Sequence, residues 1–503
     1  MRKTIDRREF LKLAGLLSLG YAIPQWIARP AVQQFSSRRQ NVLIVLFDAF
    51  SASNISLYGY PRQTTPNIDR LAERAIVYHN HIASGNFTTP GTASLLTGTL
   101  PWTHRAFFLY DPIIKSLKEK NIFGVFADYH RLAYTHNPAA DVFLTQFLAE
   151  IDQLTLWEDL YLSKNNIVNK WFRNDFDIAS VSWERAFHRE EDGEAYSLYL
   201  SHMYENLKRD FEEIRQNFPD GLPGASGSHF LLEDGIDQLQ KSISAAPQPF
   251  LGYYHFFPPH DPYHTRTGFW GSFQNDHYLP IEKPPHIFKR DWSAEFILQK
   301  RAEYDEFILY VDSEFARLYN ALEQDGLLDN TWLVLTSDHG EMFERLIDRH
   351  TTEVLYQPIV RIPLLIFPPG QESRVDVFEN TSAIDLLPTL SHVTQHEIPA
   401  WTEGKVLPPF SISLADAKKD VFSSMVRETD ARGHVTKATA TILRDNFKLI
   451  YYYGYQELGE AGELIELYDL QADPEELNNL YPGENRIADE LLGILKAKGE
   501  AGK

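Results

Sequence analysis

Two short stretches of the sequence place side chains that can bind a metal ion. The stretch 337–341 reads Ser-Asp-His-Gly-Glu, so the Asp338 carboxylate stands next to the His339 imidazole, and Asp48 follows an apolar run at 41–47. Divalent cations prefer oxygen ligands, and Zn²⁺ or Mn²⁺ also accepts imidazole nitrogen. An Asp after a strand is more often a helix cap or turn residue than a ligand. The adjacent imidazole nevertheless favours a divalent metal site formed by Asp48, Asp338 and His339.

A candidate nucleophile lies in the hydroxyl-rich stretch 86–98. Thr88 and Thr89 precede Pro90-Gly91, and a short helix is predicted to begin at Thr92. The N–H groups and the dipole at a helix N-terminus favour an anion. A hydroxyl beside a divalent metal can lose its proton near neutral pH. The same residues also suit an ordinary capped helix, so both interpretations stay open on this evidence.

The elements that must position these groups are apolar runs without alternation, which are typical of strands buried on both faces of a parallel sheet. Three of the runs lead into Asp48, His260 and Asp338. In open α/β sheets the site lies beyond the carboxyl ends of the strands. The predicted strands cover residues 41–47, 250–256, 332–336 and 362–367.

The chain divides into two predicted parts after an N-terminal segment. Residues 40–400 form the expected catalytic domain, with a charged, aromatic-rich helical insertion at about 150–245. Residues 401–503 contain short strand-like segments and an amphipathic helix at 487–498. The expected fold class is therefore α/β. A large mixed, mostly parallel sheet is flanked by helices, and a small C-terminal α+β subdomain carries an antiparallel sheet.

Composition excludes several functional classes. The chain has 503 residues, 43% hydrophobic and 23% charged, which is typical of a globular protein. Its net charge of -21 opposes a nucleic-acid partner, because sequence-independent binding of nucleic acid needs a basic surface. The absence of cysteine excludes disulfides, thiolate metal ligands and a cysteine nucleophile.

Residues 1–31 predict an export signal. Arg7-Arg8, followed by Phe10-Leu11-Lys12, resembles the bacterial twin-arginine signal. The apolar stretch after it ends at Pro24 and is shorter than the ~20 residues that a spanning helix needs. We expect the twin-arginine export machinery as a partner and a periplasmic or extracellular location. An amphipathic helix is one alternative; an uncleaved anchor on the outer face of the membrane is another, and only the anchor implies membrane contact.

The order and spacing of these segments are similar to those of the sulfatase family of the alkaline phosphatase superfamily. The similarity runs from about residue 40 to 485 and omits only the insertion. Each motif alone is weak, but eight in the same order are specific. The matching segments are Asn41–Asp48, Tyr58–Tyr60 with Thr65–Leu71, Thr88–Pro101, His260–Tyr263, Thr336–Glu341, His350 with Leu355–Leu364, Ala383–Thr389, and Lys448–Ile450 with Leu467–Pro474.

The resemblance implies an alkaline phosphatase-like fold with a divalent metal (Ca, Mg, Mn or Zn) held by Asp48, Asp338 and His339. The family's nucleophile position falls on Thr88, which would also contact the metal. In the family this position is a Cys or Ser that is converted to formylglycine, and Thr cannot follow the known route to that residue.

Four further positions depart from the family pattern. The second Asp of the usual Asp-Asp pair is Ala49, and a nearby Arg is Ser51. The Arg of the nucleophile motif is Thr92, and Thr352 stands near the place of a frequent Lys. Each departure falls on a residue that the family uses for sulfate chemistry, whereas the residues expected to bind the metal are retained.

Thr is the nucleophile type of phosphodiesterases and phosphotransferases in the same superfamily. We therefore expect a metal-dependent hydrolase that cleaves phosphate mono- or diesters of a small molecule, glycan or lipid through Thr88. His260 and His350 fall at family substrate-binding positions and would stabilise charge or supply a proton. Asp261 and His264 offer a possible second metal site.

Two other functions stay open on the sequence. The first is a sulfatase that works without formylglycine. The second is a non-catalytic relative that binds sulfated or phosphorylated glycans, although simple anion binding does not require the set Asp48, Thr88, Asp338 and His339.

Overall fold

The computed structural model describes residues 39–160, 162, 216–225, 228–274, 276–411 and 420–501. The predicted signal at 1–31 and most of the predicted insertion lie outside these residues. The predicted ends of the insertion and the predicted domain boundary near residue 400 are not tested by the described residues and stay predictions.

The main element is an eight-stranded sheet in the order β12-β2-β11-β8-β1-β7-β3-β4. Its strand pairs are parallel except for the two that involve β11, which confirms the predicted mixed, mostly parallel sheet. The strands are β1 (Asn41–Phe47), β2 (Ile76–Ile82), β3 (His130–Thr135), β4 (Gln153–Leu154), β7 (Phe250–Phe256), β8 (Thr331–Thr336), β11 (Leu364–Phe367) and β12 (Val375–Ser382).

The first strand lies at the centre of this sheet. Leu46 of β1 pairs with His255 of β7 on one side and with Thr336 of β8 on the other, both in parallel register. The buried Asn41 amide joins the same neighbours, because its Oδ1 accepts from Phe250 N at 3.1 Å and its Nδ2 donates to Thr331 Oγ1 at 3.2 Å. This pairing brings the carboxyl ends of three strands to one place.

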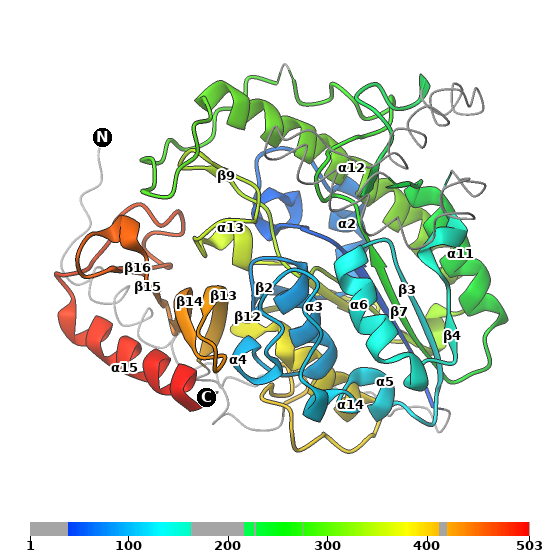
Figure 1. Ribbon diagram of the computed structural model, residues 1–503. Helices are drawn as coiled ribbons and strands as arrows, with labels where there is room; N and C mark the ends of the chain where they lie inside the picture. The colour runs from blue at the N-terminus through cyan, green and yellow to red at the C-terminus, as the bar shows by residue number, and fades with distance from the viewer. Residues whose placement is uncertain are drawn as a thin grey trace, which may run out of the picture. The chain divides into compact units, whose positions relative to one another are not determined.

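Helices cover both faces of the sheet, which explains why β1 is apolar without alternation. Leu43, Val45 and Phe47 pack in one core cluster with residues of α2, α11 and α12, while Val42, Ile44 and Leu46 pack in another with residues of α3, α5, α6 and α14. Figure 1 labels these helices around the sheet. Each such buried side chain contributes about 1.5–3 kcal/mol. The helices are α2 (Pro66–Leu71), α3 (Thr88–Thr97), α4 (Pro101–His104), α5 (Ile122–Val125), α6 (Pro138–Gln146), α11 (Leu232–Ala245), α12 (Ala294–Gln324), α13 (Gln357–Val360), α14 (Leu386–Val393) and α15 (Asn485–Ala501).

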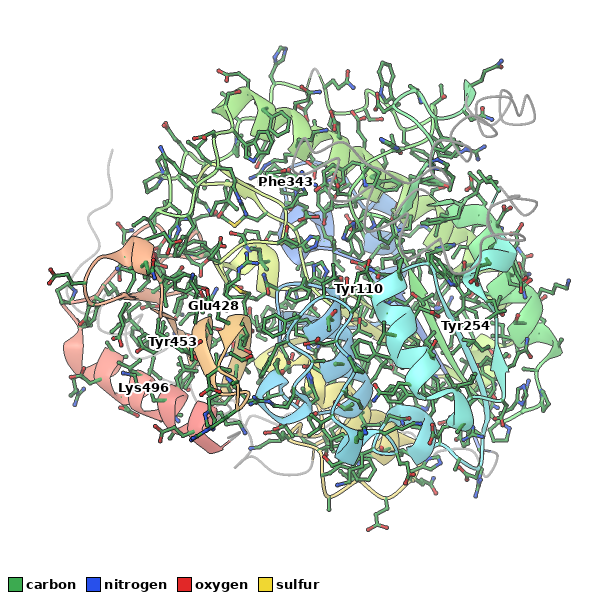
Figure 2. The ribbon with its side chains drawn as sticks, in the orientation of Figure 1. Tyr110, Tyr254, Phe343, Glu428, Tyr453 and Lys496 are labelled. Atoms are coloured by element: carbon green, nitrogen blue, oxygen red, sulfur yellow. The ribbon has the colours of Figure 1, made fainter. Side chains whose placement is uncertain are left out.

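Helix α11, at the end of the predicted insertion, belongs to the core. Leu232, Ile236 and Leu239 pack in the same cluster as Tyr254 of β7, which Figure 2 labels, and as the long helix α12. The short hairpin β5 (Gly224–Ala225) and β6 (Ser228–His229) precedes this helix.

A second sheet lies C-terminal to the first and confirms the predicted antiparallel sheet. It contains β13 (Val421–Thr429), β14 (Val435–Arg444), β15 (Phe447–Tyr453) and β16 (Glu463–Asp469) in that order, and α15 packs against β14 and β15. Ser424 N of β13 donates to Ser84 O at 2.9 Å, and the Ser423 hydroxyl donates to Ala83 O. The small sheet therefore supports the segment that leads into Thr88.

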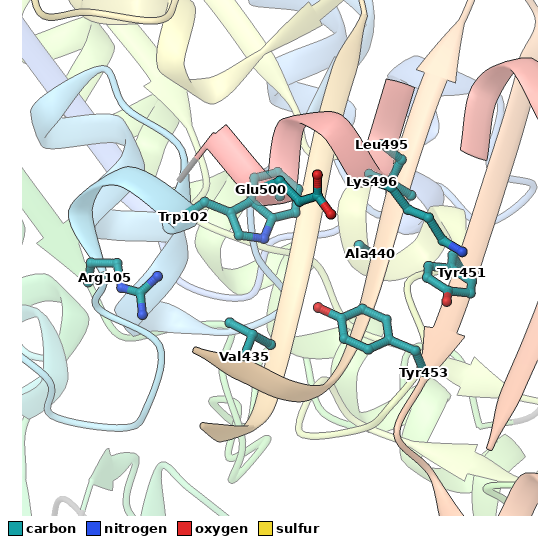
Figure 3. Close-up of a pocket in the computed structure, with 10 residues that line it drawn as sticks. Trp102, Arg105, Val435, Ala440, Tyr451, Tyr453, Leu495, Lys496 and Glu500 are labelled. Atoms are coloured by element: carbon teal, nitrogen blue, oxygen red, sulfur yellow. The ribbon is translucent and has the colours of Figure 1, made fainter. Parts of the chain in front are cut away.

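A pocket of about 180 Å³ opens between α4, α15 and the β14–β15 face (Figure 3). Trp102, Tyr451, Tyr453 and Lys496 line it, with none of the residues predicted to perform chemistry. Within the described ranges, no helix combines the length and the apolar character that crossing a bilayer requires.

Candidate active site

The carboxyl ends of β1 and β8 bring together the predicted metal ligands. Asp48 follows β1 directly, and Asp338 and His339 follow β8 after one serine; all three side chains are 0% exposed. Their ligand atoms all lie within 4.8 Å of one another. We call Asp48, Asp338 and His339 the metal cluster.

The metal cluster contains buried polar atoms that the protein does not satisfy. His339 Nε2 lies 3.3 Å from Asp48 Oδ1 and 3.7 Å from Asp338 Oδ2. Asp48 Oδ1 and His339 Nε2 therefore have only the 3.3 Å contact with each other, and neither makes a well-directed hydrogen bond with a described residue. Because an unpaired buried polar atom costs about 1–3 kcal/mol, these atoms fit a bound cation.

The two carboxylates of the metal cluster differ in their surroundings. Burial alone raises the pKa of Asp48, but the hydrogen bond from His255 and the imidazole of His339 hold it well below its ordinary value. Burial and the nearby Asp48 charge raise the pKa of Asp338. Burial lowers the pKa of His339, but the two carboxylates outweigh it and raise that pKa to about 9. The arrangement therefore favours positive charge between two carboxylates.

Thr88 is the first residue of α3 and points to the metal cluster. Its Oγ1 lies 3.5 Å from Asp48 Oδ2 and accepts a hydrogen bond from Asn137 Nδ2 at 3.1 Å. The helix was predicted to begin at Thr92, and this prediction was wrong by four residues. Pro90 lies in the first turn, where its missing N–H costs no helical hydrogen bond.

A close backbone contact fixes α3 against the loop after β8. A Cβ atom on Gly91 would lie 2.3 Å from the Asp338 carbonyl oxygen. Only glycine permits this approach, so the Thr-Thr-Pro-Gly stretch sets the distance between Thr88 and the metal cluster.

His260 and His350, the predicted proton donors or charge stabilisers, lie beside the metal cluster. The ring centroid of His350 is 4.3 Å from that of His339 and 4.8 Å from that of His260. Buried Glu341 accepts from or donates to His350 Nδ1 at 3.0 Å. Burial raises the pKa of Glu341 to about 8, and burial with the neighbouring imidazoles lowers the pKa of His350 well below its ordinary value. His350 is therefore neutral near pH 7.

The structure does not assemble a second metal site from Asp261 and His264. The Asp261 carboxylate pairs with Arg349 at 2.9 Å, and His264 Nδ1 lies 2.9 Å from the carbonyl oxygen of Leu222. In the described part of the chain, the metal cluster is the only group of three or more acidic or histidine side chains close enough together to hold a metal ion.

Two site residues were missed by the sequence analysis. Asn137, after β3, donates through Nδ2 to both Asp48 Oδ2 and Thr88 Oγ1. His255, on β7, contacts Asp48 Oδ2 at 3.0 Å. Asn137 follows a strand of the same parallel set, and that position was its only signal in the sequence.

Three of the residues that depart from the family pattern lie at the metal cluster or next to His350, whose carbonyl oxygen accepts from Thr352 N at 2.8 Å. Ala49 adopts a left-handed backbone conformation (φ 56°), and its N–H donates to Asp338 Oδ1 at 3.4 Å. The Thr92 hydroxyl lies 3.5 Å from Asp338 Oδ2, and Thr352 is buried. No cationic side chain stands at any of these three positions.

Comparisons of this chain with family models and with known proteins agree on one family. A family model described as "Sulfatase" matches residues 40–396, and one described as "N-sulphoglucosamine sulphohydrolase, C-terminal" matches residues 347–498. An uncharacterized sulfatase of Escherichia coli (strain K12) is 25% identical over 90% of this chain and 85% of its own.

Two further relatives extend this comparison. The multifunctional alkaline phosphatase superfamily protein PehA of Trinickia caryophylli is 25% identical over 88% of this chain and 91% of its own. The crystal structure of the phosphonate monoester hydrolase of Agrobacterium radiobacter has a TM-score of 0.63 and 19% identity, covering 92% of this chain and 96% of that one. This likeness supports the alkaline phosphatase-like fold.

Proposed function

The chain belongs to the sulfatase family and is an ester hydrolase, and we propose that it cleaves phosphate mono- or diesters, with a bound divalent metal, through a covalent intermediate on Thr88. The observation that carries this proposal is the position of Thr88 Oγ1, at the head of α3 and 3.5 Å from a carboxylate oxygen of the metal cluster.

The donor atoms suit a divalent cation. Asp48, Asp338 and His339 would hold it, with Thr88 at its open side, and the unpaired Asp48 Oδ1 and His339 Nε2 support this assignment. When bound, such an ion supplies positive charge that favours ionisation of a hydroxyl and neutralises phosphoryl oxygens.

The first half of the reaction transfers the phosphoryl group to the protein. Thr88 Oγ1 attacks phosphorus, and its proton has an acceptor in Asp48 Oδ2. The bond from phosphorus to the alcohol oxygen breaks, and the departing alkoxide takes a proton. Partly exposed His260 is placed to give that proton, and its ring lies against His350.

The second half restores the protein. Water attacks the phosphorus of phosphothreonine and gives a proton to His260, which lost one in the first half. The bond to Thr88 Oγ1 breaks, Thr88 Oγ1 recovers its proton from Asp48 Oδ2, and phosphate or a phosphate monoester leaves. The Asn137 amide and the neutral His350 offer donors to the charge that develops on oxygen.

A single hydroxyl favours phosphate over sulfate. A formylglycine hydrate has a second hydroxyl, which expels sulfate without attack of water at sulfur. Thr88 has no such group, so its intermediate must be displaced directly, and phosphorus tolerates this displacement when its oxygens are neutralised. The printed name of the Trinickia relative, a multifunctional alkaline phosphatase superfamily protein, is compatible with phosphate chemistry.

A sulfatase without formylglycine is the second candidate. The printed name of the Escherichia coli relative, a sulfatase, favours it. A paired assay decides between the two: purified protein with nitrophenyl phosphate mono- and diesters and with nitrophenyl sulfate, across Mg, Mn, Ca and Zn. We expect phosphate-ester turnover, and mass spectrometry of quenched protein should find phosphate on Thr88. Efficient sulfate cleavage with unmodified Thr88 would overturn the proposal.

Export is a separate part of the proposal and rests on Arg7-Arg8. Changing both residues to Lys should retain the protein in the cytoplasm, whereas changing Arg38 and Arg39 to Lys should not alter export. Unchanged export of the Arg7-Arg8 variant would contradict the twin-arginine route and favour an ordinary signal or an anchor.

A further inference from the structure

A chain of buried side chains lies behind the metal cluster and has no part in the proposed reaction. His255 Nε2 contacts Asp48 Oδ2 at 3.0 Å, and its Nδ1 lies 3.2 Å from the Tyr253 hydroxyl. Tyr253 also hydrogen-bonds to Thr92, whose hydroxyl lies 3.5 Å from Asp338 Oδ2. The sequence of contacts therefore begins at one metal-cluster carboxylate and returns to the other.

The direction of these hydrogen bonds follows from the chemistry of the groups. An ionised carboxylate only accepts, so in this contact His255 Nε2 carries the proton. The Nδ1 of a neutral imidazole is then an acceptor and takes the Tyr253 hydroxyl proton. Because His255 is 0% exposed, neither ring nitrogen is in contact with bulk water. Tyr253 thus fixes the tautomer that donates to Asp48.

These contacts leave Asp48 with one occupied and one free oxygen. Oδ2 accepts from His255, from the Asn137 amide and, at 3.5 Å, from the Thr88 hydroxyl, whereas Oδ1 makes no well-directed hydrogen bond with a described residue and lies 3.3 Å from His339 Nε2. A carboxylate held in this way presents one oxygen, at a fixed angle, to a cation.

Asp338 is restrained in a similar manner by the backbone. Its Oδ1 accepts from the N–H of His339 at 3.0 Å and from that of Ala49 at 3.4 Å. Its Oδ2 faces the metal cluster and has only longer contacts outside it, 3.5 Å to the Thr92 hydroxyl and 3.8 Å to His255 Nε2. The site therefore offers two single carboxylate oxygens and the His339 nitrogen, and Ala49 adds no ligand atom.

This donor set discriminates between cations. Ca²⁺ takes six to eight oxygen ligands and often binds both oxygens of a carboxylate. Zn²⁺ takes about four ligands and accepts imidazole nitrogen readily. A cluster of two single oxygens, one nitrogen and the Thr88 hydroxyl matches the second description.

We propose that His255 is a positioning residue that restricts Asp48 to one free oxygen, and that the site thereby selects Zn²⁺ over Ca²⁺. The inference rests on the metal site of the proposed function and not on its preference for phosphate. It concerns geometry at Asp48 and needs no change in the protonation of His255.

The test measures metal binding directly, in the absence of substrate. Metal-free wild type, His255→Leu and His255→Gln are titrated with Zn²⁺ and, separately, with Ca²⁺. We expect His255→Leu to weaken Zn²⁺ binding about 10–100-fold and Ca²⁺ binding much less, which narrows the preference for Zn²⁺. His255→Gln should recover most of the Zn²⁺ affinity, because the glutamine amide can donate to Asp48 Oδ2.

His136 provides a matched control. It is also 0% exposed, neither ring nitrogen has a partner among the described residues, and its ring stacks on Phe230 with centroids 3.9 Å apart. His136→Leu removes an equally buried imidazole that touches no carboxylate of the metal cluster, so Zn²⁺ affinity should be unchanged.

A spectroscopic measurement separates positioning from direct ligation. The visible absorption of bound Co²⁺ reports its ligands, and we expect the same spectrum for wild type and His255→Leu once saturated. A spectrum that loses a nitrogen ligand in His255→Leu would overturn the positioning role.

The outcomes distinguish this inference from the proposed function. If the wild type binds no divalent cation, the metal site itself fails. If the wild type binds Zn²⁺ and folded His255→Leu binds it equally, with the same Zn²⁺ to Ca²⁺ ratio, only the inference fails. If His255→Leu does not fold, Tyr253→Phe is the substitute variant, because it removes only the hydroxyl that donates to His255 Nδ1. This variant must also weaken Zn²⁺ binding, by a smaller factor than the one expected for His255→Leu.

Discussion

Two buried groups of charged residues in this protein are built in opposite ways. The metal cluster lies at the carboxyl ends of β1 and β8, and two of its polar atoms have no protein partner in the described chain. The second group, which we call the sheet cluster, consists of Lys448, Glu466 and Glu476. Lys448 Nζ donates to Glu476 Oε1 at 2.7 Å, and Glu476 Oε2 accepts from Gln357 N at 2.8 Å.

The sheet cluster is satisfied within the protein. Both oxygens of Glu466 accept from Tyr356 at 2.8 and 2.9 Å, and Tyr452 donates to one of them at 2.9 Å. Burial is nearly complete in both clusters, so burial alone does not mark a functional site. The two clusters differ in their hydrogen bonding. A structural cluster satisfies its own polar atoms, whereas the metal cluster leaves Asp48 Oδ1 and His339 Nε2 without a well-directed hydrogen bond, and its ligand atoms lie within 4.8 Å of one another.

The largest effect should come from Thr88→Ala, which removes the nucleophile and leaves the metal cluster intact. We expect kcat to fall on the order of 10⁴–10⁶-fold with bound metal unchanged by elemental analysis. Thr89→Ala is the control, because the Thr89 hydroxyl accepts from Tyr110 N and does not contact the metal cluster. Substantial turnover in Thr88→Ala would contradict the covalent mechanism.

Asp338→Ala should empty the metal cluster itself. Turnover should fall about 10³–10⁴-fold, because a metal ion contributes several kcal/mol of transition-state stabilisation. Added metal raises the melting temperature of a protein that binds it in the folded state. We therefore expect Zn²⁺ to raise the Tm of the metal-free wild type but not that of Asp338→Ala. Full metal occupancy in this variant would rule out the assignment.

Lys448→Ala should have the opposite effect to Asp338→Ala: it should lower the stability of the fold and leave metal binding intact. Removing one partner of a buried ion pair costs about 3–5 kcal/mol, so the free energy of unfolding should fall by that amount in chemical denaturation. The rise of Tm with metal should persist. Lys437, whose exposed pair with Glu428 measures 3.1 Å, is the control, and Lys437→Ala should cost at most about 1 kcal/mol. An equal loss of unfolding free energy in Lys448→Ala and Lys437→Ala would show that the sheet cluster does not stabilise the fold.

The smallest effect concerns pH and the sheet cluster. Burial raises the pKa of Glu466, although the Tyr356 and Tyr452 hydroxyls oppose that shift. As pH rises above about 4.5, the unfolded chain releases this proton before the folded chain does, so stability should decline. Glu466→Gln should lack this decline in denaturation curves measured at a series of pH values, whereas exposed Glu463→Gln should retain it.

The sequence predicted the central strands and the metal cluster because both depend on local patterns. Strands β1 and β7 have the predicted limits, since continuous apolar runs occur where helices cover both faces. Asp338-His339 is recognisable because carboxylate and imidazole are adjacent. The edge strand β12 was missed because Asp376 and Glu379 at exposed positions and the half-buried Asn380 are typical of a loop.

His255 could not be recognised from the sequence. It lies within an apolar strand, where a lone histidine is most often a satisfied core residue, and its partner Asp48 is 207 residues away. Only strand pairing brings them together. The early start of α3 was missed for a different reason: Pro90 and Gly91 predict a turn by propensity, whereas Gly91 serves a close backbone contact.

The position of β1 between β7 and β8 also determines when the site forms. Asn41 joins residues 209 and 290 positions away, so the centre of the sheet closes two long loops. Contacts at such separation slow folding, and β8 emerges from the ribosome only after more than half of the chain. We therefore expect uptake of the proposed metal in the last stage of folding, with a time course after dilution from denaturant that follows closure of the sheet rather than formation of the helices.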